Sequence, residues 1–170
     1  YPSFIDPYTN YGLPEVPEAK WNPRPQLMSN TPGFYSWNQS LKPEFHASEA
    51  FVSNRAVAKE MIECGFGAVL TYQNDGIIRG SSALVSLGNT HTRSALIKPK
   101  VTANYSFNKG SSTQDYPSSF MGSIALLRQS IYDAIWANHN KDLSNLSLVA
   151  LHNNLKLKPI IEVNNHLSIR

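Results

Sequence analysis

The sequence contains one cysteine and no long apolar run. A single thiol, Cys64, excludes an internal disulfide framework and any zinc site that needs two or more thiolates. We expect Cys64 to be buried as a small apolar side chain. No apolar stretch approaches the roughly 18 residues of a helical membrane span, so we expect no membrane as a partner. The sequence leaves the cellular compartment open.

Charged residues are also scarce. They make up 16% of the 170 residues, with a net charge of +3, and the basic side chains are scattered singly along the chain. A protein that binds nucleic acid usually gathers Lys and Arg on one face or in a run, so we expect no nucleic-acid partner. Apolar residues make up 41%, which is enough for a folded core and excludes disorder driven by charge.

Proline divides the chain into two regions. Eight of the 11 prolines fall within residues 1–43, and because proline lacks a backbone donor, we predict a long loop there after an opening strand. The aromatic side chains of this region predict that the loop packs on the rest of the protein; they are Tyr8, Tyr11, Trp21, Phe34, Tyr35 and Trp37. We expect a single α/β unit over residues 1–170, with the strand and packed loop in residues 1–50 and βα units in residues 51–170.

Residues 51–170 alternate between helical and strand patterns. Ser53 is placed to cap a helix that Gly65 ends, and residues 66–72 read as a strand closed by an Asn-Asp-Gly turn. Short strands with hairpin-like pairing follow at residues 81–86, 95–97 and 101–107, and helices at residues 117–137 and 143–154 precede a strand that begins at Pro159. The first of these two helices has an apolar stripe that we expect to face the core: Phe120, Ile124, Leu127, Ile131 and Ile135. The order of elements predicts an α/β fold with a mostly parallel sheet.

Motifs that carry chemistry are few. Gly65 and Gly67 lack the third glycine of a dinucleotide-binding turn, and Lys109 precedes Gly110, against the order of a nucleotide P-loop. The sequence has no Gly-x-Ser-x-Gly elbow, and its five histidines form no His-x-His pair and no His-Glu-x-x-His set. We therefore predict no catalytic residue. Four of the histidines are expected at the solvated surface, whereas His46, in the aromatic loop, is a candidate to line a cleft.

The polar loop at residues 108–115 has two interpretations. It follows a strand, and a parallel barrel carries its working loops at the carboxyl ends of its strands, so Ser112, Gln114 and Asp115 are candidates to line a cleft. In the second interpretation the serine and aspartate side chains cap the following helix, and the residue types favour this one.

Three segments resemble one family. Residues 2–12 read Pro-Ser-Phe-Ile-Asp-Pro-Tyr-Thr-Asn-Tyr-Gly and look like the first barrel strand of the metal-dependent amidohydrolase superfamily, in its imidazolonepropionase-like branch. That strand usually reads Pro-Gly-(Phe/Leu)-Ile-Asp-x-His-x-His. Residues 58–69 are similar to the next family signature, a helix that ends in glycine before a strand, and residues 159–165 resemble a later strand, Pro-Val-x-x-His-Ala, that delivers another metal ligand. The resemblance implies a (β/α) barrel of the TIM type and a metal that activates water to hydrolyse C–N bonds.

The chain departs from this family at the metal ligands. Tyr8 and Asn10 stand where the two histidines of the first strand would be, and Glu162 and Val163 lie around the position of the later ligand. A phenol and a neutral amide are poor zinc ligands beside imidazole. The resemblance therefore implies that this segment binds neither the family zinc nor another cofactor, and that it lacks the hydrolytic step. Asp6, Tyr8 and Asn10 are then candidates to line a cleft.

Several interpretations stay open. In the simplest interpretation Asp6 begins a turn with Pro7. Residues 2–12 then resemble the family only because they form a generic strand. Our leading hypothesis is a fragment of an amidohydrolase-like barrel that starts within the first strand, because an eight-unit barrel has about 250 residues. Its unpaired strand edges would pair with the remainder of a larger polypeptide or with a second copy. The alternative is a binding or scaffolding α/β module that holds a partner or ligand with its aromatic loop.

Overall fold

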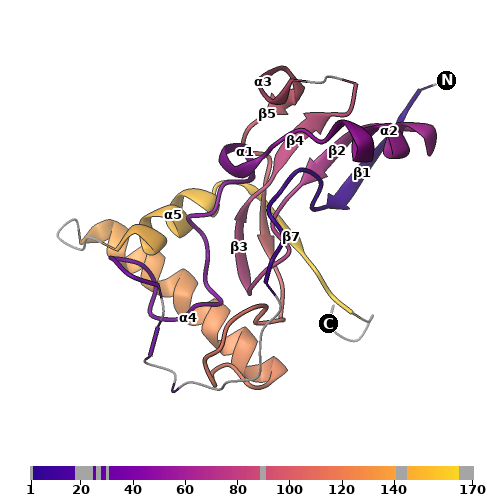
Figure 1. Ribbon diagram of the computed structural model, residues 1–170. Helices are drawn as coiled ribbons and strands as arrows, with labels where there is room; N and C mark the ends of the chain where they lie inside the picture. The colour runs from indigo at the N-terminus through magenta and orange to yellow at the C-terminus, as the bar shows by residue number, and fades with distance from the viewer. Residues whose placement is uncertain are drawn as a thin grey trace.

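The computed structural model describes residues 2–17, 25, 28–29, 31–88, 91–140 and 145–164. Its elements in chain order are strand β1 (Phe4–Thr9), helices α1 (Ala47–Ala50) and α2 (Arg55–Glu63), strands β2 (Phe66–Thr71), β3 (Ile78–Ser81) and β4 (Ala83–Ser86), helix α3 (Thr92–Ala95), strands β5 (Leu96–Lys98) and β6 (Thr102–Tyr105), helices α4 (Phe120–His139) and α5 (Leu146–Asn154), and strand β7 (Lys158–Ile161). Helices α4 and α5 pack on each other at the side of β3, and β1, β2 and α2 lie together at the other end of the molecule (Figure 1).

One long hairpin belongs to two sheets. The first sheet has the strand order β1-β2-β4-β5, and the second has the order β3-β6-β7. β3 and β4 lie end to end with Ser82 between them, and β5 and β6 form the returning arm. The two arms pair antiparallel in both sheets, and at the junction the backbone of Ser82 exchanges hydrogen bonds with Val101 and Thr102. The hairpin-like pairing predicted for this region is confirmed.

The strand directions correct the prediction of a mostly parallel sheet. β1 pairs parallel with β2 and β6 with β7, but the pairs β2–β4, β4–β5 and β3–β6 are antiparallel. A parallel crossover needs a dozen or more residues, and the connections from β2 to β4 (residues 72–82) and from β4 to β5 (residues 87–95) are shorter than that, so these strands return antiparallel. Because the β3–β4 arm runs against both of its neighbours, β1, β2, β6 and β7 all run in the same direction. Over the described ranges the strands do not close into a barrel.

Helix α2 begins one residue later than predicted and ends as predicted. Asn54, and not Ser53, is the N-cap, and its side chain accepts hydrogen bonds from two backbone N–H groups of the first turn at 3.1 and 3.4 Å. Gly65 has a φ of +95°, which is the left-handed conformation that ends a helix. Cys64 is exposed. The expectation that it is buried was wrong because it forms the C-cap turn, on the solvent side of the helix.

Helix α4 buries a face that the sequence pattern did not predict. Ser119 caps it, accepting from a backbone N–H at 3.1 Å. The side chains that α4 buries are Ser123, Leu126, Ser130 and Ala134. The predicted stripe lies beside this face, with Phe120 and Ile135 exposed to 45% and 42%, because the residues of α4 that pack in one cluster with Leu151 of α5 are Leu126 and Ala134. The buried Ser130 hydroxyl is satisfied within the helix, since it donates to the carbonyl of Leu126 at 2.8 Å.

Two apolar clusters form the core, one for each sheet. The cluster of the first sheet consists of Tyr11, Ala47, Phe51, Ala58, Val69, Ala83, Val85, Leu87 and Ala95. The cluster of the second sheet consists of Leu41, Ile77, Ile78, Ala103, Tyr105, Leu126, Ala134 and Leu151. No helix in the described ranges combines the length and the apolarity that crossing a bilayer requires.

The aromatic loop packs only in part. Tyr11 is buried, and its hydroxyl donates to the carbonyl of Asn54 at 3.1 Å. Trp37 is 42% exposed but stacks on Tyr116, with ring centroids 6.3 Å apart. Phe34 is 71% exposed, so the expectation that it packs was wrong. Trp21 lies outside the described residues.

The buried face of α4 can be tested by paired truncations. We expect Leu126→Ala to lower the free energy of unfolding by about 3 kcal/mol, because it leaves a cavity between α4, α5 and the second sheet. Ile135→Ala, in the half-exposed stripe, removes a side chain of the same size and should cost less than half as much. Urea unfolding followed by circular dichroism measures both. Equal losses would contradict the burial described above.

Candidate functional site

Polar side chains gather where the parallel strands end. Because β1, β2, β6 and β7 run in the same direction, the residues that follow them lie toward one end of the sheets, where α/β folds usually bind ligands. We call the group found there the strand-end cluster; it consists of Asp6, Tyr8, Tyr72, Asn74, Arg79 and Glu162.

Tyr72 lies at the centre of this cluster. It is 3% exposed, and its ring meets the edge of the Tyr8 ring at a centroid distance of 5.7 Å. The Tyr8 hydroxyl accepts from the side-chain amide of Asn74 at 3.3 Å. Burial is the largest cause that raises the pKa of Tyr72 above its ordinary value, and Tyr8 and the nearby carboxylates add to it against the opposing effect of Arg79. The Tyr72 phenol therefore stays protonated and does not serve as a base.

Arg79 and Glu162 form an ion pair in the same cluster. Arg79 is 3% exposed, its Nε donates to the carbonyl of Gly76 at 3.0 Å, and its guanidinium contacts the Glu162 carboxylate. The backbone N–H of Glu162 donates to the carbonyl of Tyr105 at 2.9 Å, which holds the residue beside the end of β6. Since a buried charge is costly unless it is paired, each partner depends on the other.

The strand-end cluster does not fit a transition metal. The ligands of hydrolytic zinc are imidazoles and carboxylates, whereas Tyr8 offers a phenol that is already bonded to an amide. Glu162, the carboxylate at the end of β7, is already paired with Arg79. Among the residues that the structure describes, no three His, Cys, Asp or Glu side chains could together hold a metal ion. These residues therefore support no metal-dependent step.

Asp6 serves the backbone of β1. Its Oδ1 accepts from the backbone N–H of Tyr8 at 2.9 Å, across Pro7, and the pairing of β1 with β2 shifts register between Asp6 and Thr9. This is the bond of an Asx-type turn, so β1 contains both the strand and the turn that the sequence suggested. Asn10 follows the strand and is exposed.

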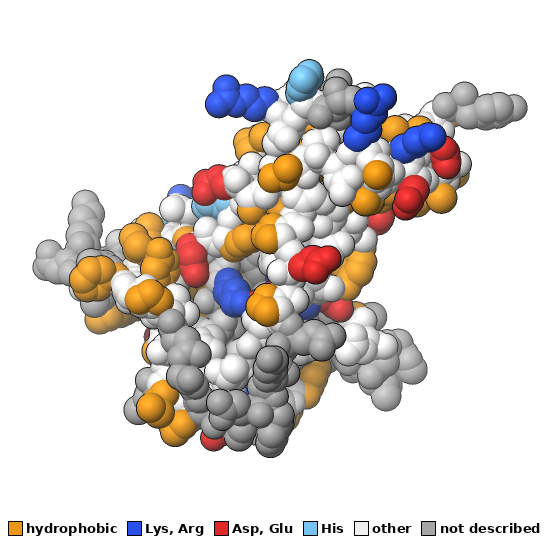
Figure 2. Space-filling view, viewed as in Figure 1, with side chains coloured by type: hydrophobic (Ala, Val, Ile, Leu, Met, Phe, Trp, Pro, Cys, Tyr) orange, Lys and Arg blue, Asp and Glu red, His pale blue; other side chains and the backbone are white. Residues whose placement is uncertain are grey.

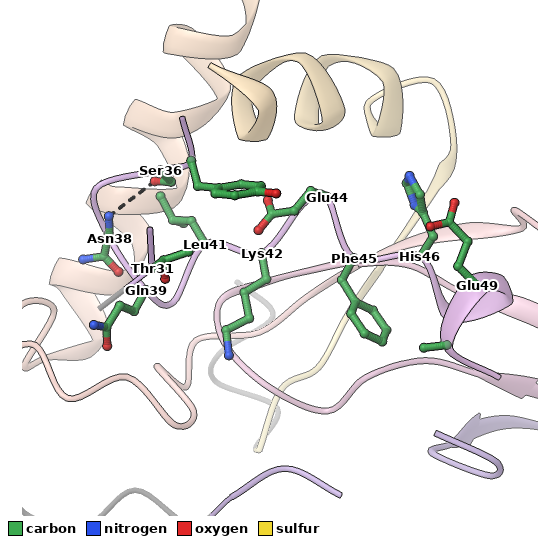
Figure 3. A pocket seen from close by; sticks show the side chains of 12 residues that line it. Thr31, Ser36, Asn38, Gln39, Leu41, Lys42, Glu44, Phe45, His46 and Glu49 are labelled. Atoms are coloured by element: carbon green, nitrogen blue, oxygen red, sulfur yellow. Dashed lines mark hydrogen bonds between the residues drawn. The ribbon is translucent and has the colours of Figure 1, made fainter. Parts of the chain in front are cut away.

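A groove with a volume of about 520 Å³ is lined by residues between 31 and 50. Its floor is held in place, because residues 41–46 run parallel to β3 through isolated bridges at Leu41 and His46. In Figure 3, His46 and Glu49 project together on one side of this segment, whereas Lys42 and Phe45 project on the other. The groove is distinct from the strand-end cluster, with which it shares no residue.

His46 is a sequence candidate that does line this groove. Its Nδ1 lies 2.8 Å from Oγ of Ser81, and its Nε2 lies 3.2 Å from Nζ of Lys100. Burial is the largest cause that lowers the pKa of His46, and Lys100 lowers it further, against the opposing charges of Glu49 and Glu44. A neutral ring fits these contacts, since Nε2 then accepts from the ammonium while Nδ1–H donates to the hydroxyl.

The contact between His46 and Ser81 is not a nucleophile with its base. In a hydrolase triad an acidic group behind the imidazole stabilises the imidazolium that forms. Here the ammonium of Lys100 occupies that place and disfavours the imidazolium. Ser81 is also fully buried, so its hydroxyl cannot reach a substrate. The contact fixes His46 against β3.

Asp75 joins three segments of the chain beneath the groove. It is 4% exposed, accepts from the backbone N–H and the hydroxyl of Ser111 at 2.7 and 2.8 Å, and forms an ion pair with Lys42. Burial is the largest single influence on the pKa of Asp75 and would raise it, but the bonds from Lys42 and Ser111 together outweigh it and lower the pKa. Gly110 has a φ of +63°, and a Cβ added there would lie 2.0 Å from Oδ1 of Asp75, so this close approach requires glycine.

The loop at residues 108–115 braces the aromatic loop. The buried side chain of Gln114 donates to the carbonyl of Trp37 at 2.9 Å and accepts from the backbone N–H of Gln39 at 2.7 Å. Ser112 is buried beside it, and Asp115 is exposed. The interpretation that this loop caps α4 was wrong, because the chain continues for several residues before the helix begins.

The structure separates the seven residues proposed to line a cleft. His46 lines the groove, and Asp6 and Tyr8 belong to the strand-end cluster. The other four belong to neither; they are Asn10, Ser112, Gln114 and Asp115. Sequence reasoning missed Arg79, although an arginine directly after Ile77 and Ile78 in a strand-like segment signals a buried charge that needs a partner.

The surface offers no broad basic area on the face shown in Figure 2, where acidic and basic side chains are interspersed. That face therefore lacks the electrostatic footprint of a polyanion site.

The chain is similar in structure to an amidohydrolase from Thermotoga maritima MSB8, with a TM-score of 0.69 and 15% sequence identity. The likeness covers 99% of this chain and 46% of that one, so this chain spans less than half the length of that structure. No family model matches the sequence, and no curated protein matches it either. At this identity the likeness concerns the fold, and the chain has an amidohydrolase-like fold of mixed α/β type with two sheets.

The lowered pKa of His46 predicts a pH dependence of stability. Because the folded protein binds a proton at His46 less readily than the unfolded chain, whose ordinary pKa is 6.5, this contribution is complete above that pH and is lost as the pH falls through the folded value. Urea midpoints measured from about pH 7.5 to about pH 5 should therefore fall. In His46→Gln, which keeps a polar side chain beside Ser81, this fall should be much smaller. An unchanged slope in the variant would assign it to other groups.

The buried carboxylate of Asp75 predicts a large cost of neutralisation. Asp75→Asn should lower the free energy of unfolding by about 3 kcal/mol, because Lys42 loses its counter-charge. Glu63→Gln makes the same chemical change in the exposed pair that Glu63 forms with Lys59 at 3.8 Å, and should leave the urea midpoint nearly unchanged. Similar effects of the two substitutions would show that the burial of Asp75 does not matter.

Proposed function

We propose that residues 1–170 form part of an amidohydrolase-like (β/α) barrel of the TIM type whose strand ends in this segment bind no metal. The observation that carries the proposal is the strand-end cluster, where Tyr8 bonds to Asn74 and Arg79 pairs with Glu162. These contacts occupy the positions at which the family resemblance of β1 and β7 implies metal ligands. The pattern of residues 2–12 supports the imidazolonepropionase-like branch, whose members hydrolyse C–N bonds.

The chemistry of these residues supports a segment that does not catalyse hydrolysis by itself. Hydrolysis of a C–N bond needs an activated water and an acid for the leaving nitrogen. Tyr72 is a protonated phenol, and the Glu162 carboxylate is held by Arg79, so neither is free to accept a proton from water. The segment would then shape a site completed by other residues, or serve as a degenerate module within a larger protein.

The outer strand edges support a partner that continues the sheets. Within the described residues β1 pairs only with β2, and β7 only with β6. Phe4 and Ile5 are 68% and 63% exposed, and Ile161 is 50% exposed. Exposed apolar edges pair readily with further strands, so we propose that they meet the remainder of a larger polypeptide or a second copy. Sedimentation velocity separates these sources, because a stable dimer supports the second copy and a monomer argues against it.

A binding module is the second candidate function, and one observation favours it. The groove of about 520 Å³ lies against the aromatic loop and has a volume typical of small-molecule sites. Its floor is bridged to β3 and its ends are braced by α5 and by Asp75, so the groove is formed before any ligand arrives.

The metal-free strand end can be tested by restoring the family ligands. After zinc loading and desalting, the protein should retain far less than one zinc per chain in elemental analysis. Tyr8→His combined with Asn10→His places two imidazoles two residues apart, and should raise the affinity for zinc at least about tenfold over Tyr8→His alone. Stoichiometric zinc in the unaltered protein, lost on Tyr8→Phe, would overturn the proposal.

A further inference from the structure

The groove at residues 31–50 presents carboxylates whose charge is not neutralised. Glu44 accepts from the hydroxyl of Ser147 at 2.8 Å, which orients it without cancelling its charge. Glu49 is exposed on α1, and neither glutamate forms an ion pair with another residue that the structure describes. Both carboxylates line the groove.

The cations near these carboxylates are already engaged. Lys42 lines the groove, but its ammonium pairs with Asp75 and also donates to the hydroxyl of Ser111 at 3.2 Å. Lys100 donates to Nε2 of His46 and is not among the residues that line the groove. His46 itself is held as a neutral ring by these neighbours. Among the residues that the structure describes, the groove therefore carries a net negative charge, since its lysine, Lys42, is already paired with Asp75.

The remainder of the wall is largely apolar. Tyr35, Leu41, Phe45 and Ala50 contribute to the lining. The backbone beneath Phe45 is fixed, because its carbonyl accepts from the N–H of Ser81 at 3.0 Å, and the N–H of Lys42 donates to the carbonyl of Ile78 at 2.8 Å. A preformed wall lowers the entropic cost of binding. Aromatic rings beside a carboxylate favour a cation that carries apolar groups.

We propose that this groove binds a small organic cation, with an ammonium or guanidinium head facing Glu44 and an apolar stem lying on Tyr35 and Leu41. A charge-assisted hydrogen bond to Glu44 supplies selectivity for the head, the charge of Glu49 adds to the negative potential of the groove, and burial of the stem supplies the remaining affinity. This inference rests on the second candidate function, the binding module, and it does not depend on whether the strand ends bind a metal.

The charge preference can be measured with three probes of equal stem length. Hexylammonium, 1-hexanol and hexanoate are titrated separately into isotope-labelled protein, and amide chemical shifts are followed by NMR. We expect shifts within residues 31–50, with hexylammonium binding about tenfold more tightly than hexanol and hexanoate binding most weakly. Tenfold corresponds to about 1.4 kcal/mol.

Single substitutions of glutamate by glutamine test which carboxylates bind the cationic head group of the ligand. Glu44→Gln keeps an acceptor for Ser147, and Glu49→Gln changes an exposed side chain, so both variants should stay folded. Glu44→Gln should weaken hexylammonium binding about fivefold, Glu49→Gln should weaken it less because its charge acts from farther away, and neither should change hexanol binding. Glu60→Gln, on the exposed side of α2, makes the same change outside the groove and should have no effect. The urea midpoint of each variant verifies that the fold is retained.

Each outcome decides the proposal. Equal affinities for the three probes, or equal effects of Glu44→Gln and Glu60→Gln, would overturn the cation preference while keeping a binding groove. An absence of shifts for every probe would overturn the binding module as well. Neither result bears on the zinc content of the Tyr8→His and Asn10→His protein, so failures of the two proposals are distinguishable.

Discussion

The backbone hydrogen bonds between residues 78–86 and 96–105 continue from one sheet into the other through Ser82, and the rest of the molecule is placed by this hairpin. β2 adds to its β4 part and carries β1 with it, while β7 adds to its β6 part. The segment that forms the floor of the groove runs along β3. The groove and the strand-end cluster are therefore built on the same hairpin, although they share no side chain.

Two buried charges near the start of the hairpin connect it to further segments of the chain. Asp75 and Arg79 lie four residues apart, and they reach toward different parts of the chain, Asp75 to Lys42 and Ser111, Arg79 to Glu162. Each charge is nearly excluded from water, so each contact is hard to break without leaving an unpaired ion. The turn before β3 thus ties the aromatic loop, the loop at residues 108–115 and the end of β7 together.

The local sequence pattern predicted where helices and strands lie better than it predicted which of their faces are buried. Gly65 ends α2 as expected, because a left-handed stop depends on its own backbone. The buried face of α4 was missed, since Ser123 is buried through a hydrogen bond to the carbonyl of Phe107, and Ala134 through packing in the cluster that includes Leu151 of α5, and not through their own hydropathy. The sequence also suggested that Tyr8 and Asn10 stand where the resembled family has ligand histidines, and this stays a prediction. The pairing of Arg79 with Glu162 was not predicted, because the two residues are 83 positions apart and Arg79 belongs to no motif.

The same separation along the chain bears on how the contacts of Asp75 form. The contacts of Asp75 span 33 residues to Lys42 and 36 residues to Ser111, so the carboxylate is satisfied only after three distant segments have met. Closing loops of this length costs more conformational entropy than forming a local turn, so these contacts depend on distant parts of the chain having come together. Until then the Asp75 carboxylate stays hydrated. The free-energy cost of dehydrating it is met only when Lys42 and Ser111 come into contact with it. The brace on the aromatic loop therefore depends on the tertiary fold as a whole, whereas the cap and stop of α2 are made by residues within or next to that helix.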